Sequence, residues 1–272
     1  MADSGGRARQ IRLAGIVLSR VNYGEADLIV TFLTRERGLV NALARYGRRS
    51  IRRFGGGLLS PGASAWYDFT FKPGSTLAFV ENGEENPKAP RLAPEALVQS
   101  LGAFALELVK GFEAPDNPAE ESFNLLMRHL VRLARQIPPP EGIPGGRAAY
   151  TRSVRLISLD FYLKYLELAG FGPRLSGCLL CGTAPEAGPG WKWNPAAGGL
   201  YCPACAPPDR QGRAISQPLL ERLSAVPQAG QQALDDHDLA EAELFFEKLA
   251  EHHLGRRLKA MKTARQILRG KR

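Results

Sequence analysis

The 272-residue sequence contains no long apolar run and only four cysteines. No stretch approaches the roughly 18 consecutive apolar residues that suggest a membrane-spanning helix. The polar opening, residues 1–7, is followed by no apolar segment of the kind that secretory signals contain. We therefore expect a cytoplasmic protein. Because thiols are kept reduced in the cytosol, the four cysteines need an explanation other than disulfide bonds.

Motifs of catalysis are absent as well. The chain contains no phosphate-binding glycine loop, no nucleophile motif, no paired-carboxylate arrangement above chance and no internal repeat. These absences predict a protein that is not an enzyme. The apolar fraction of 44% and the charged fraction of 23% are typical of a globular protein. At roughly 100–200 residues per domain, the length favours two domains.

Positive charge is concentrated at the two ends of the sequence. The formal net charge is +9, and it divides into +5 for residues 1–88, −4 for residues 89–255 and +8 for residues 256–272. The last segment contains no acidic residue. This asymmetry favours defined anion-binding surfaces over a generally basic protein, and nucleic acid is the first partner that it suggests.

Residues 11–82 have the pattern of a small β-domain. β-Branched and aromatic residues dominate five short segments, and glycine- or proline-containing turns separate them. Five short strands in about seventy residues suit a closed barrel, which leaves no open edge. The predicted strands are 16–18, 27–33, 39–43, 65–71 and 77–80.

Aromatic residues cluster in the fourth predicted strand. Alternation places Tyr67, Phe69 and Phe71 on one face, which we assign to the core, and Trp66 on the other face among polar neighbours. Two interpretations of Trp66 stay open. It stacks on a nucleic-acid base, or it packs in the core or against a second domain, which is the interpretation we favour.

From Pro94 onward, the apolar residues recur at helical spacing. We expect helices around 97–108 and 123–133, the second capped by Asn117, and a third over 147–170 that ends at Gly170. Two further helices are expected near 217–226 and 239–253, with His252 and His253 at a helix end. The basic segment 256–272 is either a disordered tail or an amphipathic helix with a basic outer face.

The four cysteines form two Cys-x2-Cys pairs, Cys178/Cys181 and Cys202/Cys205, with twenty residues between them. This spacing is typical of a structural zinc site, because each short turn presents two thiolates and two turns complete a tetrahedron. Four soft thiolates without an open position favour zinc, at one ion per chain. Four unrelated buried cysteines or a redox pair are the alternatives, although no thioredoxin-like pattern surrounds either pair.

An arginine cluster follows the third predicted strand. It comprises Arg45, Arg48, Arg49, Arg52 and Arg53, with no acidic residue among them. Arginine suits phosphate because its planar fork donates two hydrogen bonds at once. A solvated loop is the alternative. Because small barrels commonly bind oligonucleotides through their loops, we predict that these arginines contact the phosphate backbone of DNA with little sequence preference.

Two stretches carry a resemblance to a known family. The first reads GIVLSRVNYGEADLIVTFLTRERGLVNALARYGRRS and continues as RRFGGGLLSPGASAWYDF, and the second, near the end, reads HHLGRRLKAMKTAR. With strands, glycines, arginines and the cysteine module in this order, the sequence resembles the RecO family of recombinational DNA-repair mediators. The resemblance covers nearly the whole chain and is densest over residues 14–70.

The resemblance implies an α+β multidomain protein. An N-terminal OB-fold barrel, residues 1–84, would bind DNA, and a C-terminal α-helical domain, residues 91–272, would carry a zinc-finger insert at 174–210. The implied function is that of a recombination mediator, bacterial and nucleoid-associated, which binds single- and double-stranded DNA and anneals complementary strands. The implied partners are RecR and the acidic C-terminal tail of single-strand-binding protein. A zinc-stapled protein scaffold without direct DNA contact is the alternative.

Basic residues of both ends are the predicted DNA contacts. They are Arg20, Arg35, Arg37, Arg45, Arg48, Arg49, Arg52, Arg53, Lys72, Arg256, Arg257, Lys259 and Lys262.

Overall fold

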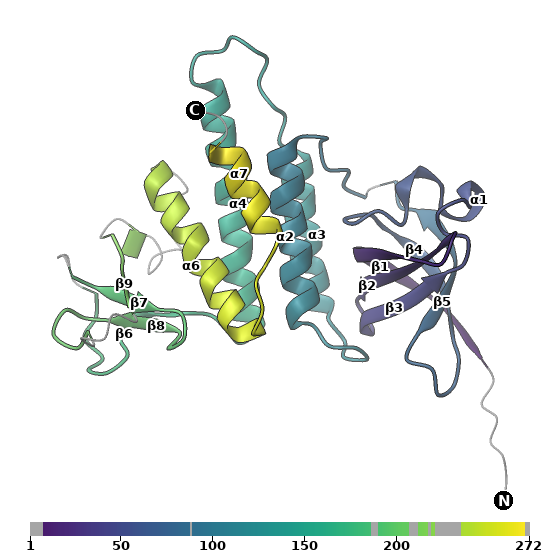
Figure 1. Cartoon of the computed structure of the whole chain (residues 1–272), viewed down its shortest axis with the longest axis horizontal. Coiled ribbons are helices and arrows are strands. Elements are labelled where there is room, and N and C mark those ends of the chain that lie inside the picture. Colours follow the sequence, from purple (N-terminus) through teal and green to yellow (C-terminus); the bar gives the residue numbers. More distant parts are fainter. Residues whose placement is uncertain are drawn as a thin grey trace, which may run out of the picture. The chain divides into compact units, whose positions relative to one another are not determined.

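The structure is a computed structural model, and it describes residues 8–87, 89–185, 190–206, 212–216, 219–220 and 235–269 (Figure 1). The chain forms two compact units. We call residues 1–137 together with 260–272 the barrel unit, and residues 138–259 the cysteine unit. Each unit is described by itself.

Five strands of the barrel unit close into a barrel in the order β1-β2-β3-β5-β4. The strands are β1 (Arg9–Tyr23), β2 (Asp27–Thr34), β3 (Gly38–Ala44), β4 (Ser64–Phe71) and β5 (Ala78–Glu85). All neighbours are antiparallel except β3 and β5, which are parallel. The short helix α1 (Ile51–Phe54) and the 3-10 turn η1 (Gly55–Gly57) lie between β3 and β4. The sequence therefore predicted the number of strands and the barrel correctly.

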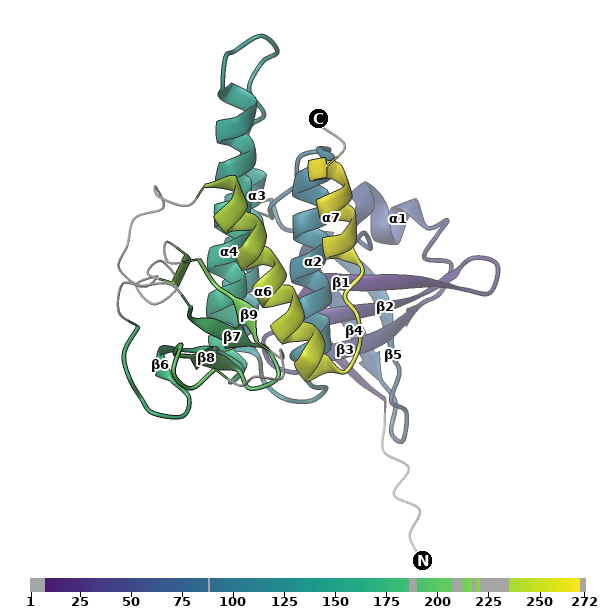
Figure 2. The ribbon, with the colours of Figure 1, turned by 60° about the vertical axis from the view of Figure 1, so that its left-hand side comes forward.

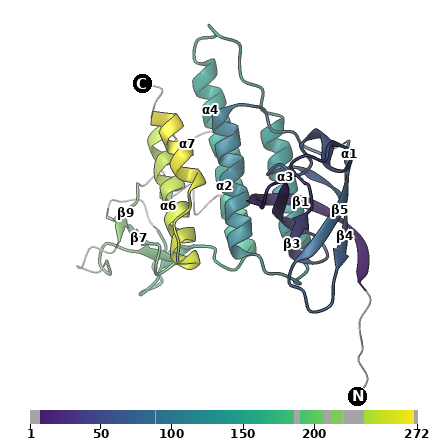
Figure 3. The ribbon, with the colours of Figure 1, turned by 45° about the vertical axis from the view of Figure 1, so that its right-hand side comes forward.

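The first strand is much longer than the predicted segment 16–18. Its first half pairs with β4, from Arg9 opposite Phe71 onward, and its second half pairs with β2 up to Tyr23 opposite Asp27. β5 also runs further than expected, to Glu85, and lies beside β4 (Figure 3). These extensions contain polar residues that face outward, so the sequence pattern resembles that of a loop.

The barrel is filled by apolar side chains that alternate along the strands, including Val17, Val30 and Phe32. Tyr67 and Phe69 are fully buried, and the Phe32 ring lies 4.7 Å from the Tyr67 ring and 5.1 Å from the Phe69 ring, between centroids. Phe71 is partly buried against this core. The predicted aromatic core face is therefore confirmed.

The barrel unit also contains α2 (Ala96–Phe112), α3 (Glu120–Ala134) and α7 (Ala260–Arg269). α7 lies along α2 (Figure 2), with Met261 and Ala264 fully buried and the Ala260 N–H donating to Glu107 Oε2 over 3.1 Å. Of the two interpretations of the basic end, the helical one is correct for residues 260–269. Asn117 was predicted to cap α3, but that prediction is wrong, because Ala119 is the residue before its first turn.

The cysteine unit contains two helices, α4 (Gly146–Leu168) and α6 (Asp236–Leu254), and a small sheet in the order β6-β8-β7-β9. The strands are β6 (Arg174–Cys178), β7 (Lys192–Asn194), β8 (Gly199–Tyr201) and β9 (Arg213–Ala214). β7 packs on α6 through Trp193, whose ring centroid lies 4.1 Å from that of Phe245. Gly170 follows α4 with a φ of 80°, which ends the helix as predicted.

Parts of two predictions lie outside the described residues. The helix expected near 217–226 is described only at Leu219 and Leu220, and the insert expected at 174–210 is not described at 186–189 and 207–210. Intramolecular contacts group α2 and α3 with the barrel. The expected division into domains at residues 1–84 and 91–272 stays a prediction.

Candidate functional site

The arginine cluster occupies the connection that leaves β3, residues 45–53, which we call the arginine loop. Arg45, Arg48, Arg49 and Arg52 are exposed and Arg53 is half-buried. The loop is ordered by its own backbone, because the Gly47 N–H donates to Ala44 O over 3.1 Å. The Arg53 side chain donates to Ser50 Oγ over 3.1 Å and to the Arg45 carbonyl.

The arginine loop is fixed against the turn between β1 and β2. The Arg48 N–H donates to Ala26 O over 3.0 Å, and Arg48 Nη1 donates to Glu25 O over 2.9 Å. The N–H of Tyr46 donates to Asp27 Oδ1 over 2.7 Å. Two segments about twenty residues apart in sequence therefore form one surface at this end of the barrel.

Two cations, one directly after β3 and one directly after β4, lie over the same aromatic ring. Arg45 Cζ lies 4.9 Å and Lys72 Nζ 4.6 Å from the centroid of the Phe79 ring. Phe79 is partly exposed on β5 and lies next to Leu43 of β3. Cation–π attraction favours these positions, so Phe79 gathers two predicted DNA contacts that are far apart in sequence.

Arg35 and Arg37 lie elsewhere, in the β2–β3 connection at the far end of β2 from Asp27. The Arg37 guanidinium pairs with Asp116 and lies 4.3 Å from the Phe71 ring centroid, and Arg35 lies 4.9 Å from the Phe123 ring centroid. Both side chains thus have partners within the barrel unit. They are not part of the surface that the arginine loop forms.

The remaining predicted contacts divide between the two units. Arg20 is exposed on β1, three residues before Tyr23, and Lys262 is exposed on α7 in the barrel unit. Arg256, Arg257 and Lys259 are exposed residues that follow α6 and belong to the cysteine unit. His252 and His253 occupy the last turn of α6, as expected.

Aromatic residues on the outer surface of the barrel were missed or misjudged from the sequence. Trp66 was expected mainly in a buried environment, but its exposed fraction is 45%, because it lies on the outer face opposite Ala14 and Glu84. Tyr23 and Tyr46 were not singled out, although both are exposed in the two segments that form the loop surface. The sequence did contain a signal of their exposure, because both tyrosines stand next to glycine in predicted turns, and Tyr46 also stands next to arginine.

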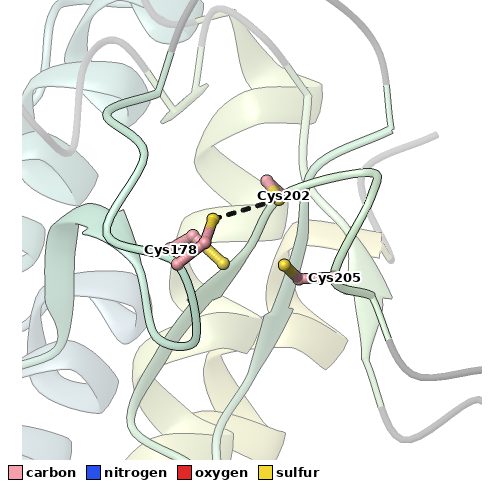
Figure 4. A group of neighbouring side chains, drawn as sticks. Cys178, Cys202 and Cys205 are labelled. Carbon is pink, nitrogen blue, oxygen red and sulfur yellow. Dashed lines mark hydrogen bonds between the residues drawn. The ribbon is translucent and has the colours of Figure 1, made fainter.

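The four cysteines come from two turns, one after β6 and one after β8. Their sulfur atoms all lie within 4.8 Å of one another, and those of Cys181 and Cys202 are 3.7 Å apart. In Figure 4 the labelled Cys178, Cys202 and Cys205 project from these turns toward a common point. Zinc–sulfur bonds of about 2.3 Å in a tetrahedron place sulfurs about 3.8 Å apart, so the arrangement is compatible with a zinc site.

Backbone hydrogen bonds close both cysteine turns, and contacts within the cluster shift the pKa values of the thiols. The Gly182 N–H donates to Cys178 O over 2.9 Å, and the Cys205 N–H to Cys202 O over 3.1 Å. Burial opposes ionisation of Cys178, but hydrogen bonds from the backbone of Cys202 and Cys181 outweigh it and lower its pKa to about 6. The neighbouring Cys202 and Cys181 thiols raise the pKa of Cys205 to about 12. A hydrogen bond with the Thr183 side chain lowers the pKa of Cys181 as well, so Cys205 is the thiol whose ionisation most needs a compensating cation.

A closed five-stranded barrel with a basic, aromatic loop surface has the architecture of barrels that bind oligonucleotides. The chain matches two family models, Recombination protein O N terminal over residues 9–85 and Recombination protein O C terminal over residues 149–262. The DNA repair protein RecO of an Anaeromyxobacter species is 33% identical over 263 residues, which cover 95% of this chain and 96% of the relative. That of Myxococcus xanthus is 32% identical, covering 93% and 96%.

The chain therefore belongs to the RecO family of DNA repair proteins. Similarity extends to the DNA repair protein RecO of Rubrobacter xylanophilus, which is 35% identical over 201 residues, or 73% of each chain. Membership confirms the resemblance inferred from the sequence and supports a general role in DNA repair and recombination. Within the described residues, no helix combines the length and apolar character that crossing a bilayer requires.

Proposed function

We propose that this protein is a recombination mediator that binds single- and double-stranded DNA through the phosphate backbone. The observation that carries the proposal is the fixed position of the arginine loop, whose exposed arginines lie at one end of the barrel. The side chains of Arg49 and Arg52 make no hydrogen bond or ion pair with the described part of the chain. They are therefore available to phosphate oxygens.

The proposed mechanism is electrostatic. Cations that neutralise phosphates on two strands lower the repulsion between the strands, so complementary sequences anneal. Contacts that reach phosphate but not base edges give little sequence preference. We place these contacts at Arg45, Arg48, Arg49, Arg52, Arg53 and Lys72, with Arg20, Arg256, Arg257, Lys259 and Lys262 as additional contacts. Arg35 and Arg37 make a smaller contribution, because aromatic and acidic neighbours already engage them.

Family membership supports the proposed partners. With RecR, the protein would help to load recombinase onto DNA that single-strand-binding protein covers, and it would engage the acidic tail of that protein. The cytoplasm is the compartment that this role requires. The chemistry is binding rather than bond breaking, so the proposal includes no catalytic residue.

Zinc is the proposed structural cofactor, held by Cys178, Cys181, Cys202 and Cys205. Bound zinc would supply the positive charge that lets all four thiols ionise, and it would join the two turns of the small sheet. The strands of this sheet are only two to five residues long. A metal link is therefore the expected source of their stability.

Fluorescence anisotropy with labelled single strands and duplexes tests the proposal. Reversing two loop charges, Arg49→Glu and Arg52→Glu, should weaken binding at 50 mM salt by about tenfold or more and reduce the slope of log affinity against log salt by about 1.5. The matched control is Arg128→Glu with Arg135→Glu, two exposed arginines of the barrel unit outside the loop. Equal effects of both pairs would contradict a localised site, and no DNA binding by the unmodified protein would favour a protein scaffold.

A further inference from the structure

Two tyrosines present their rings to solvent at this surface: Tyr46 lies within the arginine loop, and Tyr23 is the last residue of β1. The exposed fraction is 55% for Tyr23 and 63% for Tyr46. Within the described part of the chain, neither ring stacks on another aromatic ring and neither hydroxyl has a hydrogen-bond partner. Single exposed apolar residues are common on protein surfaces, so exposure alone does not indicate a binding site.

Strand register places Tyr23 on the outer face of the barrel. Tyr23 is directly opposite Asp27, and Val21 is opposite Ile29, which is in turn opposite Leu43 on β3. Leu43 is next to Phe79 on β5. Because residues opposite one another share a face, Val21, Ile29, Leu43 and Phe79 form a partly exposed apolar row across four strands. Tyr23 lies at one edge of this row, and Arg45 and Lys72 lie beside Phe79 at the other.

Tyr46 is held in an unfavourable backbone conformation. Its φ is +52°, in the left-handed region that bulky residues seldom adopt. Three hydrogen bonds keep it there: its N–H donates to Asp27, and its carbonyl accepts from Arg49 and Ser50 over 3.0 and 2.9 Å. Strained residues that surrounding contacts enforce are concentrated at functional sites. The contacts at this end of the barrel therefore hold an aromatic residue with an exposed side chain in a strained conformation.

Asp27 joins the two tyrosines. It is the strand partner of Tyr23 and the hydrogen-bond acceptor for Tyr46, so both rings project from neighbouring positions. Phe79 differs from them, because two cations already lie over its ring. The cations are thus positioned to contact phosphates, and the two tyrosine rings are accessible for stacking on flat apolar groups.

We propose that Tyr23 and Tyr46 stack on unpaired bases, so that this surface prefers single strands over duplex DNA. This proposal rests on the proposed function, because it concerns the same loop surface. Bases within a duplex are stacked on each other and their faces are not accessible, whereas an unpaired base can stack on an aromatic ring at any sequence. The arginines and Lys72 then contribute to the affinity for both single-stranded and duplex DNA. The tyrosines contribute only to the affinity for single strands.

An abasic oligonucleotide separates the two contributions, because it has the phosphates of a single strand but no bases. The ligands are oligothymidylate of about 16 nucleotides, an abasic strand of the same length and a duplex. The variant combines Tyr23→Ala with Tyr46→Asn, since asparagine tolerates the left-handed conformation. Tyr23→Phe with Tyr46→Phe keeps the rings, and Trp66→Ala removes an exposed aromatic ring that lies opposite Ala14 and Glu84.

The unmodified protein should bind oligothymidylate at least about fivefold more tightly than the abasic strand. The Ala/Asn variant should lose this preference while its affinity for the abasic strand and the duplex, and its salt slope, stay unchanged. The Phe variant and Trp66→Ala should keep the preference. Equal binding of thymidylate and abasic strands by the unmodified protein would overturn the inference, and so would an equal loss for all three ligands in the Ala/Asn variant. Absence of binding to any ligand would instead contradict the proposed function.

Discussion

The carboxylate of Asp27 accepts a hydrogen bond of 2.7 Å from the backbone N–H of Tyr46. Asp27 is the first residue of β2, and Tyr46 is the second residue after β3. Because β2 and β3 are antiparallel, these positions are at the same end of the barrel. The Asp27 side chain therefore helps to fix the arginine loop, together with the hydrogen bonds that Arg48 donates to Ala26 and Glu25.

Replacing Asp27 with Ala should loosen the arginine loop without unfolding the barrel. Loss of one partly exposed hydrogen bond is expected to lower the free energy of unfolding by about 1 kcal/mol. Hydrogen exchange at the Tyr46 amide should become faster, and DNA affinity should fall several-fold. Asp27→Asn keeps an oxygen acceptor and is the matched control. If the alanine variant exchanges at the original rate, the hydrogen bond does not fix the loop.

Gly47 is required by packing at the start of the same loop. A Cβ atom at this position would lie 2.9 Å from Ala44 Cβ and 3.0 Å from Ala44 O, so the backbone would have to shift. Gly47→Ala is expected to lower the free energy of unfolding in urea by about 1–3 kcal/mol. Gly55→Ala is the control, because its added Cβ meets only Ile51 Cγ2, at 3.7 Å. Equal stability of the two variants would disprove the packing argument.

The sequence predicted the repetitive parts of the fold well. Alternation identified the five strands and the aromatic core of Tyr67 and Phe69, and helical spacing identified α2, α3, α4 and α6. The full length of β1 was missed because its ends carry polar side chains on an outer face. Alternation reports burial, and these residues are not buried.

Only part of the loop surface could be predicted from the sequence. The arginine cluster located the loop, because charged residues are identified directly from the sequence. The association of Arg45 with Phe79 depends on the parallel pairing of β3 and β5, a long-range contact that no local pattern records. That of Lys72 with Phe79 depends on the antiparallel pairing of β4 and β5. The cysteine spacing was informative because each Cys-x2-Cys turn brings two thiols together locally. Bringing the two turns together required only the pairing of β6 with β8.

The four-cysteine cluster should contain zinc. Metal analysis of protein purified without chelator should find about one equivalent per chain. Cys202→Ser should lose the metal and expose Trp193, detected as a red shift of tryptophan emission. Thr183→Val is the control, because Thr183 contacts the Cys181 thiol but supplies no sulfur. Metal-free protein that unfolds like the purified protein would contradict a structural role.

Zinc binding should also depend on pH. Thiols must lose protons to bind the metal, and the pKa of Cys205 in the metal-free cluster is raised to about 12. Lowering the pH therefore favours release of the ion, most steeply where the zinc-bound thiolates become protonated. Competition with a zinc-binding dye should show an apparent affinity that falls between pH 8 and pH 6, with about one or more protons taken up per ion released. An affinity independent of pH would exclude thiolate ligands.

His253 should titrate below its ordinary range. Burial lowers its pKa first, and the positive charge of protonated His252 lowers it further. The Phe171 ring, 4.6 Å away between centroids, contributes to that burial. Because the unfolded chain takes up the proton at a higher pH, His253 reduces stability as the pH falls through about 6.5 toward the folded-state pKa. Phe171→Ala should raise the pKa in an NMR titration, and an unchanged value would assign the shift to other neighbours.

The buried pair of Arg155 and Glu243 links α4 to α6 within the cysteine unit. Arg155 Nε donates to Glu243 Oε1 over 2.7 Å and Arg155 Nη2 to Glu243 Oε2 over 3.1 Å, with both side chains almost fully buried. Removing only the carboxylate leaves a buried guanidinium without its principal partner. Glu243→Ala is therefore expected to lower the free energy of unfolding by about 3–5 kcal/mol.

Replacing both members of the pair should be far milder than replacing one. Arg155→Met with Glu243→Leu removes both charges and keeps the volume, so its stability should lie within about 1–2 kcal/mol of the original protein, or above it. Urea unfolding of Arg155→Met, Glu243→Leu and the double variant completes a double-mutant cycle. Additive losses would mean that the two side chains act independently. A strongly non-additive cycle with intact DNA binding would show that the pair stabilises the junction of α4 and α6 and has no part in the barrel surface.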